Sequence, residues 1–371
     1  MPTQTIDMNN VTSVSFNNQT VNEIKLNGNT IWPQTHNTYI YFDDDYSSQF
    51  TLTTANSTKN WDGTIETSTD GTNWTVWDGT TGVTSSNNGR LYVRGSNNTY
   101  ITGNKNNGWV FTNAHLIAIG GNIESLLDNE TVGANTHPSM ANYAFAGLFM
   151  NAPIFLVPET FLPATTLAKY CYQYLFSGTN LLIAPALPAT ILADYCYQYL
   201  FNGCTALSDI DDLHLNANTV YIGSYSNMFK GCTALTTAPA LPATTVRSMG
   251  CAAMFYGCTA LVTPPALPAT TVDTYSYNNI FYGCTSLTKL VALPAINISS
   301  NSYAGMFRNC PLIGLSTTQS GDYVNEYRIP TTGTGTATTN SFSNMFSGTH
   351  GSFTSNPTVN TTYYTWNTIV S

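Results

Sequence analysis

The chain has 371 residues, only 8% of them charged, and a formal net charge of −9. This length predicts two or three domains, and the weakly acidic balance argues against nucleic acid or an anionic membrane surface as a partner. No run approaches the roughly 18 consecutive apolar residues of a membrane span, so membrane insertion is not expected.

The first 36 residues alternate apolar and polar side chains, and an Asn-Gly pair separates two strand-like runs. This pattern predicts a β-hairpin too small to bury a core, which should add to the next domain or to another subunit. The candidate attachment residues are Val21, Ile24, Leu26, Ile31 and Trp32. Because no secretory signal is recognisable, we expect a protein placed by assembly rather than by export. The alternative is an edge hairpin that packs on its own chain.

Residues 37–128 contain short strand-like runs separated by Asp-Gly and Asn-Gly turn signals, a spacing that predicts a β-sandwich. Trp61, Trp74 and Trp77 are candidates for a sugar-stacking platform, but tryptophans in so small a domain are expected mainly in the core. The three aspartates at 43–45 invite a calcium interpretation. Because the spacing of a calcium-binding loop is absent, we expect a solvated turn and no bound metal.

From residue 129 to 313 one unit is repeated about every 26 residues, which indicates a solenoid. Each copy ends in a phenylalanine, and these closing phenylalanines are Phe149, Phe176, Phe201, Phe229, Phe255, Phe281 and Phe307. A last, divergent copy ends at Phe346, within a stretch from 314 to 371 that is expected to cap the solenoid.

Within each repeat, large apolar residues stand nine and one before the closing phenylalanine, a small residue stands five before it, and an aromatic stands four before it in most copies. This spacing predicts a short helix, with the positions seven, six, three and two before the phenylalanine turned to solvent or a partner. A glycine ends the helix, and a short strand is expected before the Leu-Pro-Ala-Thr loop. The stacked repeats should form a parallel sheet on one side and a row of short helices on the other.

All eight cysteines lie in the repeats, and five of them stand three residues after a closing phenylalanine. None has the paired spacing of a zinc site. Stacked equivalent positions rarely provide disulfide geometry, so we expect a ladder of buried, free thiols.

The pattern Phe-x-Gly-Cys-Thr-x-Leu followed by Leu-Pro-Ala-Thr-Thr resembles the BspA-type leucine-rich repeats of bacterial surface proteins and bacteriophages. Residues 25–32 are similar to N-terminal segments of phage structural proteins, and the block STDGTNWTVWDG resembles a small sandwich domain found ahead of such repeats. The resemblance implies a mixed, β-rich chain: an N-terminal β-hairpin, a β-sandwich and a leucine-rich-repeat-like α/β solenoid of about seven to eight coils. Such repeats serve as adhesion and scaffold surfaces, so neither an enzyme nor a cofactor is expected.

Two functions remain open. The first is a structural virion protein, such as a capsid decoration, head fibre or tail-associated protein. It would lie on the virion surface as a homo-oligomer, held to other virion proteins through the N-terminal segment. The second is a carbohydrate-binding adhesin of a bacterial cell surface, with an exposed aromatic patch at Tyr170, Tyr174, Tyr195 and Tyr199 stacking on sugar rings of a host glycan or meeting a neighbouring subunit.

Overall fold

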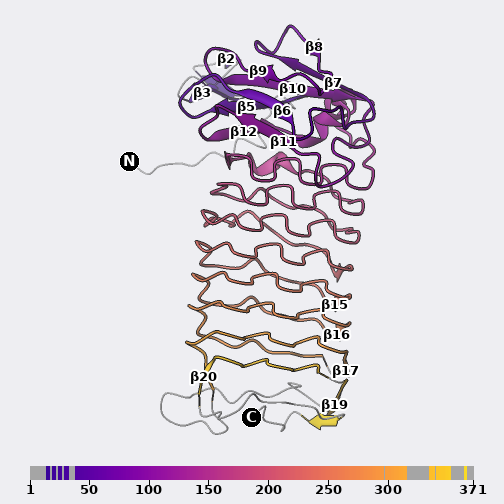
Figure 1. Ribbon diagram of the computed structural model, residues 1–371, viewed down its shortest axis with the longest axis vertical. Coiled ribbons are helices and arrows are strands. Elements are labelled where there is room, and N and C mark those ends of the chain that lie inside the picture. The colour runs from indigo at the N-terminus through magenta and orange to yellow at the C-terminus, as the bar shows by residue number, and fades with distance from the viewer. Residues whose placement is uncertain are drawn as a thin grey trace.

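The computed structural model describes residues 38–295, 297–313, 338 and 340–349 in full. Outside these ranges it describes the main chain of eight short strands, namely β1 (Val14–Phe16), β2 (Gln19–Val21), β3 (Ile24–Leu26), β4 (Asn29–Trp32), β18 (Gly314–Leu315), β19 (Thr334–Ala337), β20 (His350–Gly351) and β21 (Tyr363–Thr365). Figure 1 shows a β-sandwich at one end of a long column of stacked coils. Within the described residues, no helix has both the length and the apolar character that crossing a membrane would need.

The sandwich consists of two mainly antiparallel sheets. Its strands are β5 (Ile40–Asp44), β6 (Thr51–Thr54), β7 (Thr64–Ser68), β8 (Thr75–Val76), β9 (Val83–Thr84), β10 (Arg90–Ser96), β11 (Trp109–Thr112) and β12 (Ile117–Gly121). The larger sheet has the order β13-β12-β5-β10-β7-β8, and the smaller has the order β11-β6-β9. Alternation along the strands sends Phe42 and Leu91 inward, where Trp61, Trp77 and Trp109 complete the core.

The sandwich and the solenoid share one hydrophobic core. Strand β13 (Ile154–Leu156) belongs to the first coil, yet it pairs in parallel with β12 of the sandwich. The N–H of Trp109 donates to the carbonyl oxygen of Leu148 at 2.7 Å, and the ring of Phe149 meets that of Trp109 edge-on at 6.2 Å. The short helices η2 (Ile123–Leu126), α1 (Asn129–Gly133) and η3 (Glu159–Phe161) lie along this junction. The sandwich therefore covers the first coil, which would otherwise expose apolar side chains.

Before each closing phenylalanine the chain forms a series of tight turns, so the predicted row of short helices is wrong. In the coil that closes at Phe176, a positive φ recurs at every fourth residue, at Tyr170 (59°), Tyr174 (58°) and Gly178 (73°). A right-handed helix does not accommodate residues of that conformation. A succession of four-residue turns nevertheless repeats its buried side chains at i, i+4 and i+8, the spacing that a helix also gives.

Main-chain hydrogen bonds between coils explain why turns replace helices. The N–H of Phe145 donates to the carbonyl oxygen of Cys171 in the next coil at 2.8 Å. The N–H of Gly147 donates to the carbonyl oxygen of Gln173 at 2.7 Å. Between these two residues, the N–H of Ala146 donates within its own turn, to the carbonyl oxygen of Tyr143 at 3.2 Å. An α-helix directs its N–H groups to its own carbonyls and leaves none to join a neighbouring coil.

Before the Leu-Pro-Ala-Thr loop, where a strand was predicted, the described chain forms β13, a parallel bridge between Ile183 and Asp209, and β18, which pairs with β20, so the predicted placement is correct in part. The other parallel strands of the solenoid follow this loop or the segment equivalent to it. They are β14 (Thr219–Val220), β15 (Thr245–Val246), β16 (Thr271–Val272) and β17 (Asn297–Ile298), paired in register. The segment before the loop contains prolines, which cannot donate to a ladder, whereas the segment after it is rich in β-branched residues. The sheet continues through β19 to β21.

The buried positions of the repeat are those that the sequence predicted. The closing phenylalanines and Phe346 stack in one file, with neighbouring ring centroids 5.5 to 6.0 Å apart. Leu200, Met254 and Ile280, each one residue before a closing phenylalanine, are fully buried. All eight cysteines are buried and free, as predicted. Several positions expected to be exposed are instead buried between neighbouring coils, namely Ala146, Gly147, Gln173, Gly223, Ser226, Ala304 and Gly305. The amide of Gln173 donates to that of Gln198 in the next coil at 2.6 Å.

The N-terminal segment forms antiparallel pairs, as its alternation predicted. Strand β1 pairs with β2, and β3 pairs with β4 across the Asn-Gly turn signal. The side chains of the candidate attachment residues lie outside the described part of the chain, so their contacts stay a prediction.

Candidate functional site

The four tyrosines predicted as an exposed patch come together in two stacks along the solenoid. Tyr170 stacks between Tyr143 and Tyr195, with ring centroids 4.4 and 4.9 Å apart and rings within 3° of parallel. Tyr174 stacks on Tyr199 at 4.4 Å. We call these five residues the tyrosine stacks. All five have a positive φ. Because the members of each stack occupy the same position of the turn in successive coils, their side chains lie side by side.

Stacking covers most of the ring faces in the tyrosine stacks. Both faces of Tyr170 lie against other rings, and a Cβ at Gly223 would come within 2.4 Å of the Tyr195 ring. The ammonium group of Lys105 lies 5.0 Å from the centroid of Tyr174, which also stacks on Tyr199. Burial, and then the neighbouring Tyr199, raise the pKa of Tyr174 to about 12. These contacts cover both faces of Tyr170, Tyr174 and Tyr195 and one face of Tyr199, so most of the patch does not offer the open ring faces that sugar stacking requires.

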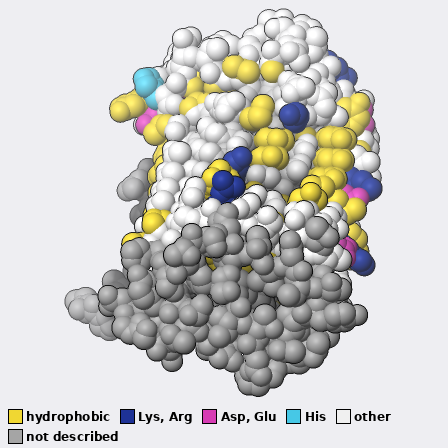
Figure 2. Space-filling model, turned by 60° about the horizontal axis from the view of Figure 1, so that its bottom comes forward, with side chains coloured by type: hydrophobic (Ala, Val, Ile, Leu, Met, Phe, Trp, Pro, Cys, Tyr) yellow, Lys and Arg dark blue, Asp and Glu magenta, His cyan; other side chains and the backbone are white. Residues whose placement is uncertain are grey.

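A second aromatic pair, which the sequence analysis missed, lies farther along the column. Tyr256 and Tyr282 each follow a closing phenylalanine directly and stack at 4.4 Å. Lys230 and Arg308 occupy the same position in the flanking coils, 5.0 Å from the ring of Tyr256 and 5.4 Å from that of Tyr282. Figure 2 shows such columns of hydrophobic side chains along the solenoid, with a few lysines and arginines among them. The signal in the sequence is the residue that follows each closing phenylalanine.

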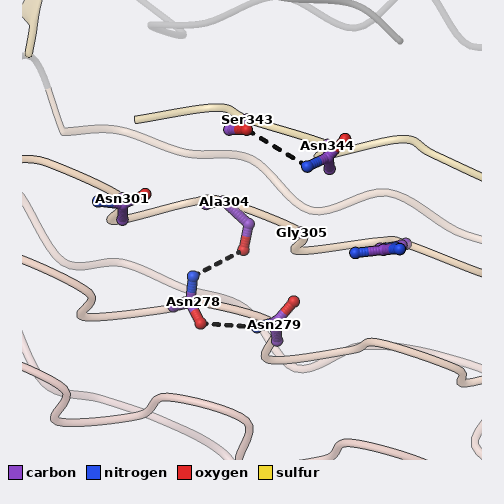
Figure 3. Close-up of a pocket in the computed structure, with 8 residues that line it drawn as sticks. Asn278, Asn279, Asn301, Ala304, Gly305, Ser343 and Asn344 are labelled. Carbon is purple, nitrogen blue, oxygen red and sulfur yellow. Dashed lines mark hydrogen bonds between the residues drawn. The ribbon is translucent and has the colours of Figure 1, made fainter. Parts of the chain in front are cut away.

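A shallow polar depression of about 210 Å³ lies over the last described coils. It is lined by Asn278, Asn279, Asn301, Ala304, Gly305, Arg308, Ser343 and Asn344 (Figure 3). The Asn279 amide donates to the side-chain oxygen of Asn278 at 2.6 Å, and Asn278 donates to the carbonyl oxygen of Ala304 at 3.3 Å. The amides of Asn278 and Asn279 are thus hydrogen-bonded within their own coil and, through Asn278, to the next coil.

Of the aspartates at 43–45, Asp45 lies exposed in a turn as expected, whereas Asp43 and Asp44 belong to strand β5. Asp44 is only 4% exposed, and its carboxylate accepts hydrogen bonds from the N–H groups of Tyr46, Ser48 and His115 at 2.8 to 3.1 Å. Burial alone would raise the pKa of Asp44, but these hydrogen bonds together hold it below its usual value. Asp43 forms an ion pair with Arg90.

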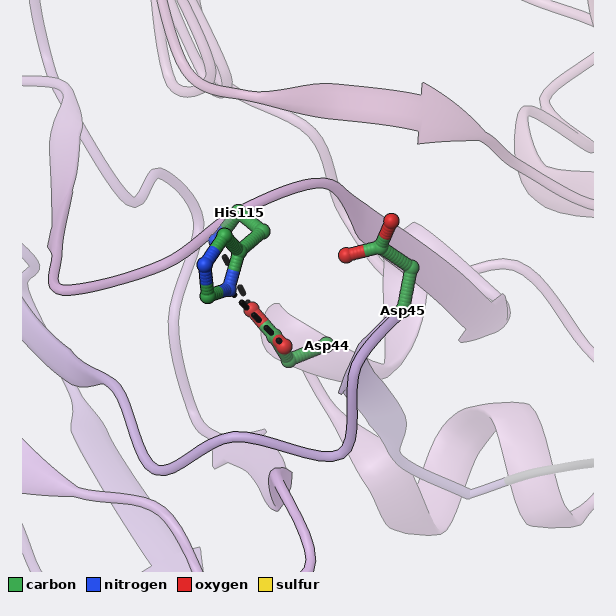
Figure 4. A group of neighbouring side chains, drawn as sticks. All are labelled: Asp44, Asp45 and His115. Atoms are coloured by element: carbon green, nitrogen blue, oxygen red, sulfur yellow. Dashed lines mark hydrogen bonds and ion pairs between the residues drawn. The ribbon is translucent and has the colours of Figure 1, made fainter.

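Asp44, Asp45 and His115 bring possible metal-ligand atoms within 4.8 Å of one another (Figure 4). Asp45 accepts a hydrogen bond from the N–H of Leu116 at 3.1 Å, and the oxygens of Asp44 already accept three main-chain N–H groups. The carboxylates therefore hold two loops of the sandwich together, a structural task that needs no cation.

The solvent face of the larger sandwich sheet carries a group of aromatic and arginine side chains, of which sequence reasoning singled out only Trp74. This aromatic sheet face consists of Tyr39, Tyr41, Trp74, Arg90, Tyr92 and Arg94, of which none is buried. Trp61 and Trp77 are core residues, as predicted, whereas Trp74 is half-buried on this face. The available signal was the alternation Arg-Leu-Tyr-Val-Arg in β10, which points its polar and aromatic members away from the core.

Comparison with known protein families identifies the repeats. The family described as BspA type leucine rich repeat region matches residues 139–262 and 197–329 with six copies, which together span just over half of the chain. A comparison with curated proteins and one with solved structures each found no match. The matched residues contain the stacked turns, the file of phenylalanines and the cysteine ladder described above. The chain therefore belongs to the BspA type leucine-rich-repeat family and is a β-rich repeat protein.

Proposed function

We propose that the protein is a non-enzymatic structural protein of a bacteriophage particle, such as a capsid decoration, head fibre or tail-associated protein. Its solenoid, inferred to contain seven to eight coils, presents a repeat surface for protein or host-surface contact. The observation that carries the proposal is that hydrogen bonds and stacked rings join neighbouring coils along the whole described column. A column of this kind suits a rigid spacer that projects from a support.

Three interactions join each coil to the next. Main-chain hydrogen bonds recur at alternate residues of the turns, as between Tyr225 N–H and the carbonyl oxygen of Gly250 at 2.8 Å. The rings of Phe229 and Phe255 stack at 5.6 Å and 0°. The thiol of Cys258 donates to the carbonyl oxygen of Phe229 at 3.1 Å. Because these contacts are repeated and buried, bending the column requires breaking several of them at once.

The N-terminal strands supply the proposed attachment. Two small antiparallel pairs, β1 with β2 and β3 with β4, bury too little surface to be stable alone. Their open edges and apolar positions suit pairing with another virion protein or with a second copy of the chain. We infer a homo-oligomer at the virion surface from this requirement for a partner.

The test compares incorporation of the full chain, and of a chain that begins at residue 37, into particles of the parent phage. We expect the full chain in purified particles and the shortened chain to be lost, although its circular dichroism spectrum remains that of the folded column. Ile24→Asp combined with Leu26→Asp should also abolish incorporation. Lys25→Asp, at the polar position of the same strand, is the matched control and should be retained. Equal incorporation of the shortened chain, or absence of the full chain from particles, contradicts the proposal.

The alternative function is that of a carbohydrate-binding adhesin of a bacterial cell surface. The aromatic sheet face of the sandwich, rather than the tyrosine stacks, favours this alternative. The faces of Tyr170 and Tyr195 are covered, so Tyr195→Ala is expected to leave sugar binding unchanged on a glycan array. One face of Tyr199 is covered by Tyr174, and Tyr199→Ala tests the other face on the same array. Loss of binding in either variant would restore the tyrosine stacks as a sugar site. The aromatic sheet face of the sandwich is the better candidate.

A further inference from the structure

We propose that the aromatic sheet face of the sandwich is a binding platform for a neutral polysaccharide chain. The inference concerns a site in the sandwich domain and does not depend on how the protein is mounted on a particle or a cell.

The register of the larger sheet brings the platform together from three strands. Tyr92 in β10 lies opposite Tyr41 in β5, and Arg90 lies opposite Asp43. On the other side of β10, Arg94 lies opposite Glu66 in β7. Side chains at these directly paired positions project to the same side of a sheet. Trp74 and Tyr39 extend the row, with ring centroids 5.9 Å apart.

The rings are held in position by the protein itself. Tyr39 meets Tyr92 edge-on at 5.4 Å, and the guanidinium group of Arg94 lies 4.2 Å from the centroid of Trp74. Gly120 provides the room in which the Tyr41 ring lies along the sheet, and Gly71 lies in ordinary van der Waals range of the Tyr92 ring. A Cβ at Gly120 would come within 2.0 Å of the Tyr41 ring, and one at Gly71 within 3.4 Å of the Tyr92 ring. Such pre-positioned rings lose little conformational entropy when a ligand binds.

The charges of this face cancel in pairs. Arg90 forms a double hydrogen bond with Asp43, and the Nε of Arg94 donates to Glu66 at 2.8 Å. Each of these four side chains is about one-third exposed, so both pairs border the rings and remain accessible. With no net charge among these groups, the face has no electrostatic preference for an acidic or a basic partner. Planar carboxylate and guanidinium groups beside aromatic rings suit a ligand that offers apolar C–H faces and many hydroxyl groups, which is a neutral sugar chain.

The experiment uses the full chain, so that the N-terminal segment is present. Binding to neutral and acidic glycans is first compared on an array. Titration calorimetry with cellohexaose, laminarihexaose and mannohexaose then measures affinity for Trp74→Ala, Tyr92→Ala and Tyr92→Phe. Tyr46→Ala is the matched control, because Tyr46 is a highly exposed tyrosine of the same domain and lies outside the platform. Unfolding temperature is measured for every variant.

We expect at least one neutral glycan to bind, and Trp74→Ala and Tyr92→Ala each to weaken its binding by about tenfold, equivalent to ~1.4 kcal/mol. Tyr92→Phe keeps the ring, so it tests the platform even if the alanine variant fails to fold. The glycan affinities of Tyr92→Phe and of Tyr46→Ala should stay within about threefold of that of the unchanged chain. Raising NaCl to about 1 M should leave the affinity unchanged, because no charge is neutralised on binding. Binding confined to acidic glycans, an absence of any glycan binding, or unchanged affinity in folded Trp74→Ala overturns the proposal.

Discussion

The thiol of Cys232 donates a hydrogen bond to the main-chain carbonyl oxygen of Phe201 in the preceding coil, at a distance of 3.1 Å. The same carbonyl also accepts the N–H of Cys204 at 3.1 Å, so it has two donors. Equivalent thiol contacts of 3.0 to 3.1 Å recur at Cys204, Cys258, Cys284 and Cys310. The cysteine ladder thus both fills the core and joins each coil to the one before it.

Removal of this thiol should cost a moderate amount of stability. Cys232→Ala deletes the hydrogen bond and leaves a small void, so we expect a loss of about 1 kcal/mol in the free energy of unfolding. Cys232→Ser should lose less, because a hydroxyl group can donate to the same oxygen. Thr179, at the same position of an earlier coil, shows that a hydroxyl group fits there, although it donates to the carbonyl oxygen of Phe176 in its own coil, at 2.8 Å. Urea unfolding measures both values, and a serine variant less stable than the alanine variant would contradict this account of the ladder.

Stability should fall at alkaline pH because the buried thiols resist ionisation. Burial raises the pKa of Cys204 to about 11 and that of Cys258 to about 12, from a reference value of 9.0. A pKa that is higher in the folded state means that the stabilising effect is complete below pH 9.0 and is lost as pH rises toward the folded value. Between pH 9.0 and the pKa in the folded state, each thiol should lower the free energy of unfolding by ~1.4 kcal/mol per pH unit.

The measurement is the urea midpoint between pH 8 and pH 10.5. Buried tyrosines such as Tyr197, whose pKa burial also raises, act in the same direction. The control is therefore Cys258→Ala, which should show a shallower decline than the unchanged chain. A urea midpoint that does not vary over this range would contradict the prediction.

The file of phenylalanines should couple neighbouring coils but not distant ones. Phe229→Ala removes a fully buried ring that stacks on Phe201 at 5.5 Å and on Phe255 at 5.6 Å, so it should cost about 3–5 kcal/mol. A double-mutant cycle with Phe255→Ala should depart from additivity by ~0.5 kcal/mol or more. The same cycle with Phe307→Ala should be additive, because in a solenoid each coil contacts only its neighbours. Equal coupling energies in the two cycles would contradict the expectation that only neighbouring coils are coupled.

Two glycines of the turns should differ in their tolerance of alanine. Gly257 has a φ of 71°, but a Cβ there would lie 4.0 Å from its nearest neighbour, the Cα of Gly231. Gly257→Ala should therefore lower the free energy of unfolding by only about 1–2 kcal/mol, the penalty for a residue with a Cβ in the left-handed conformation. At Gly147 (φ 64°) a Cβ would lie 2.3 Å from the carbonyl oxygen of Lys105 in the sandwich. Gly147→Ala should cost more, because the sandwich and the first coil must separate; thermal unfolding that ranks the two variants in the opposite order would refute this.

One buried hydroxyl group is expected to reduce stability. Tyr197 is 1% exposed, and its hydroxyl has no hydrogen-bond partner among the described residues. A buried polar group without a partner costs about 1–3 kcal/mol, so Tyr197→Phe should stabilise the protein, by up to ~1 kcal/mol after some loss of packing. Tyr199→Phe, on the half-exposed side of the same turn, is the control and should change stability by less than ~0.5 kcal/mol. Destabilisation by Tyr197→Phe would indicate that the hydroxyl is hydrogen-bonded in solution.

The repeat itself was readable from the sequence, because eight copies report which positions tolerate change. They identified the closing phenylalanines and the free cysteines, whose chemistry and spacing are enough to predict burial. The sandwich and the core positions of Trp61 and Trp77 followed from turn signals and size. All of these are local properties of pattern and composition.

The tertiary structure decided how those residues are arranged. The spacing i, i+4 and i+8 is common to helices and to four-residue turns, and only hydrogen bonding between coils, as from Phe145 to Cys171, selects the turns. Stacking in register placed Tyr170 between two other rings, and the pairing of β10 with its neighbours gathered Tyr92 and Arg94 into one face. The sequence by itself determined which side chains are buried and how often they recur. Their partners depend on contacts between residues some 26 positions apart, and a pattern read along a single chain does not contain them.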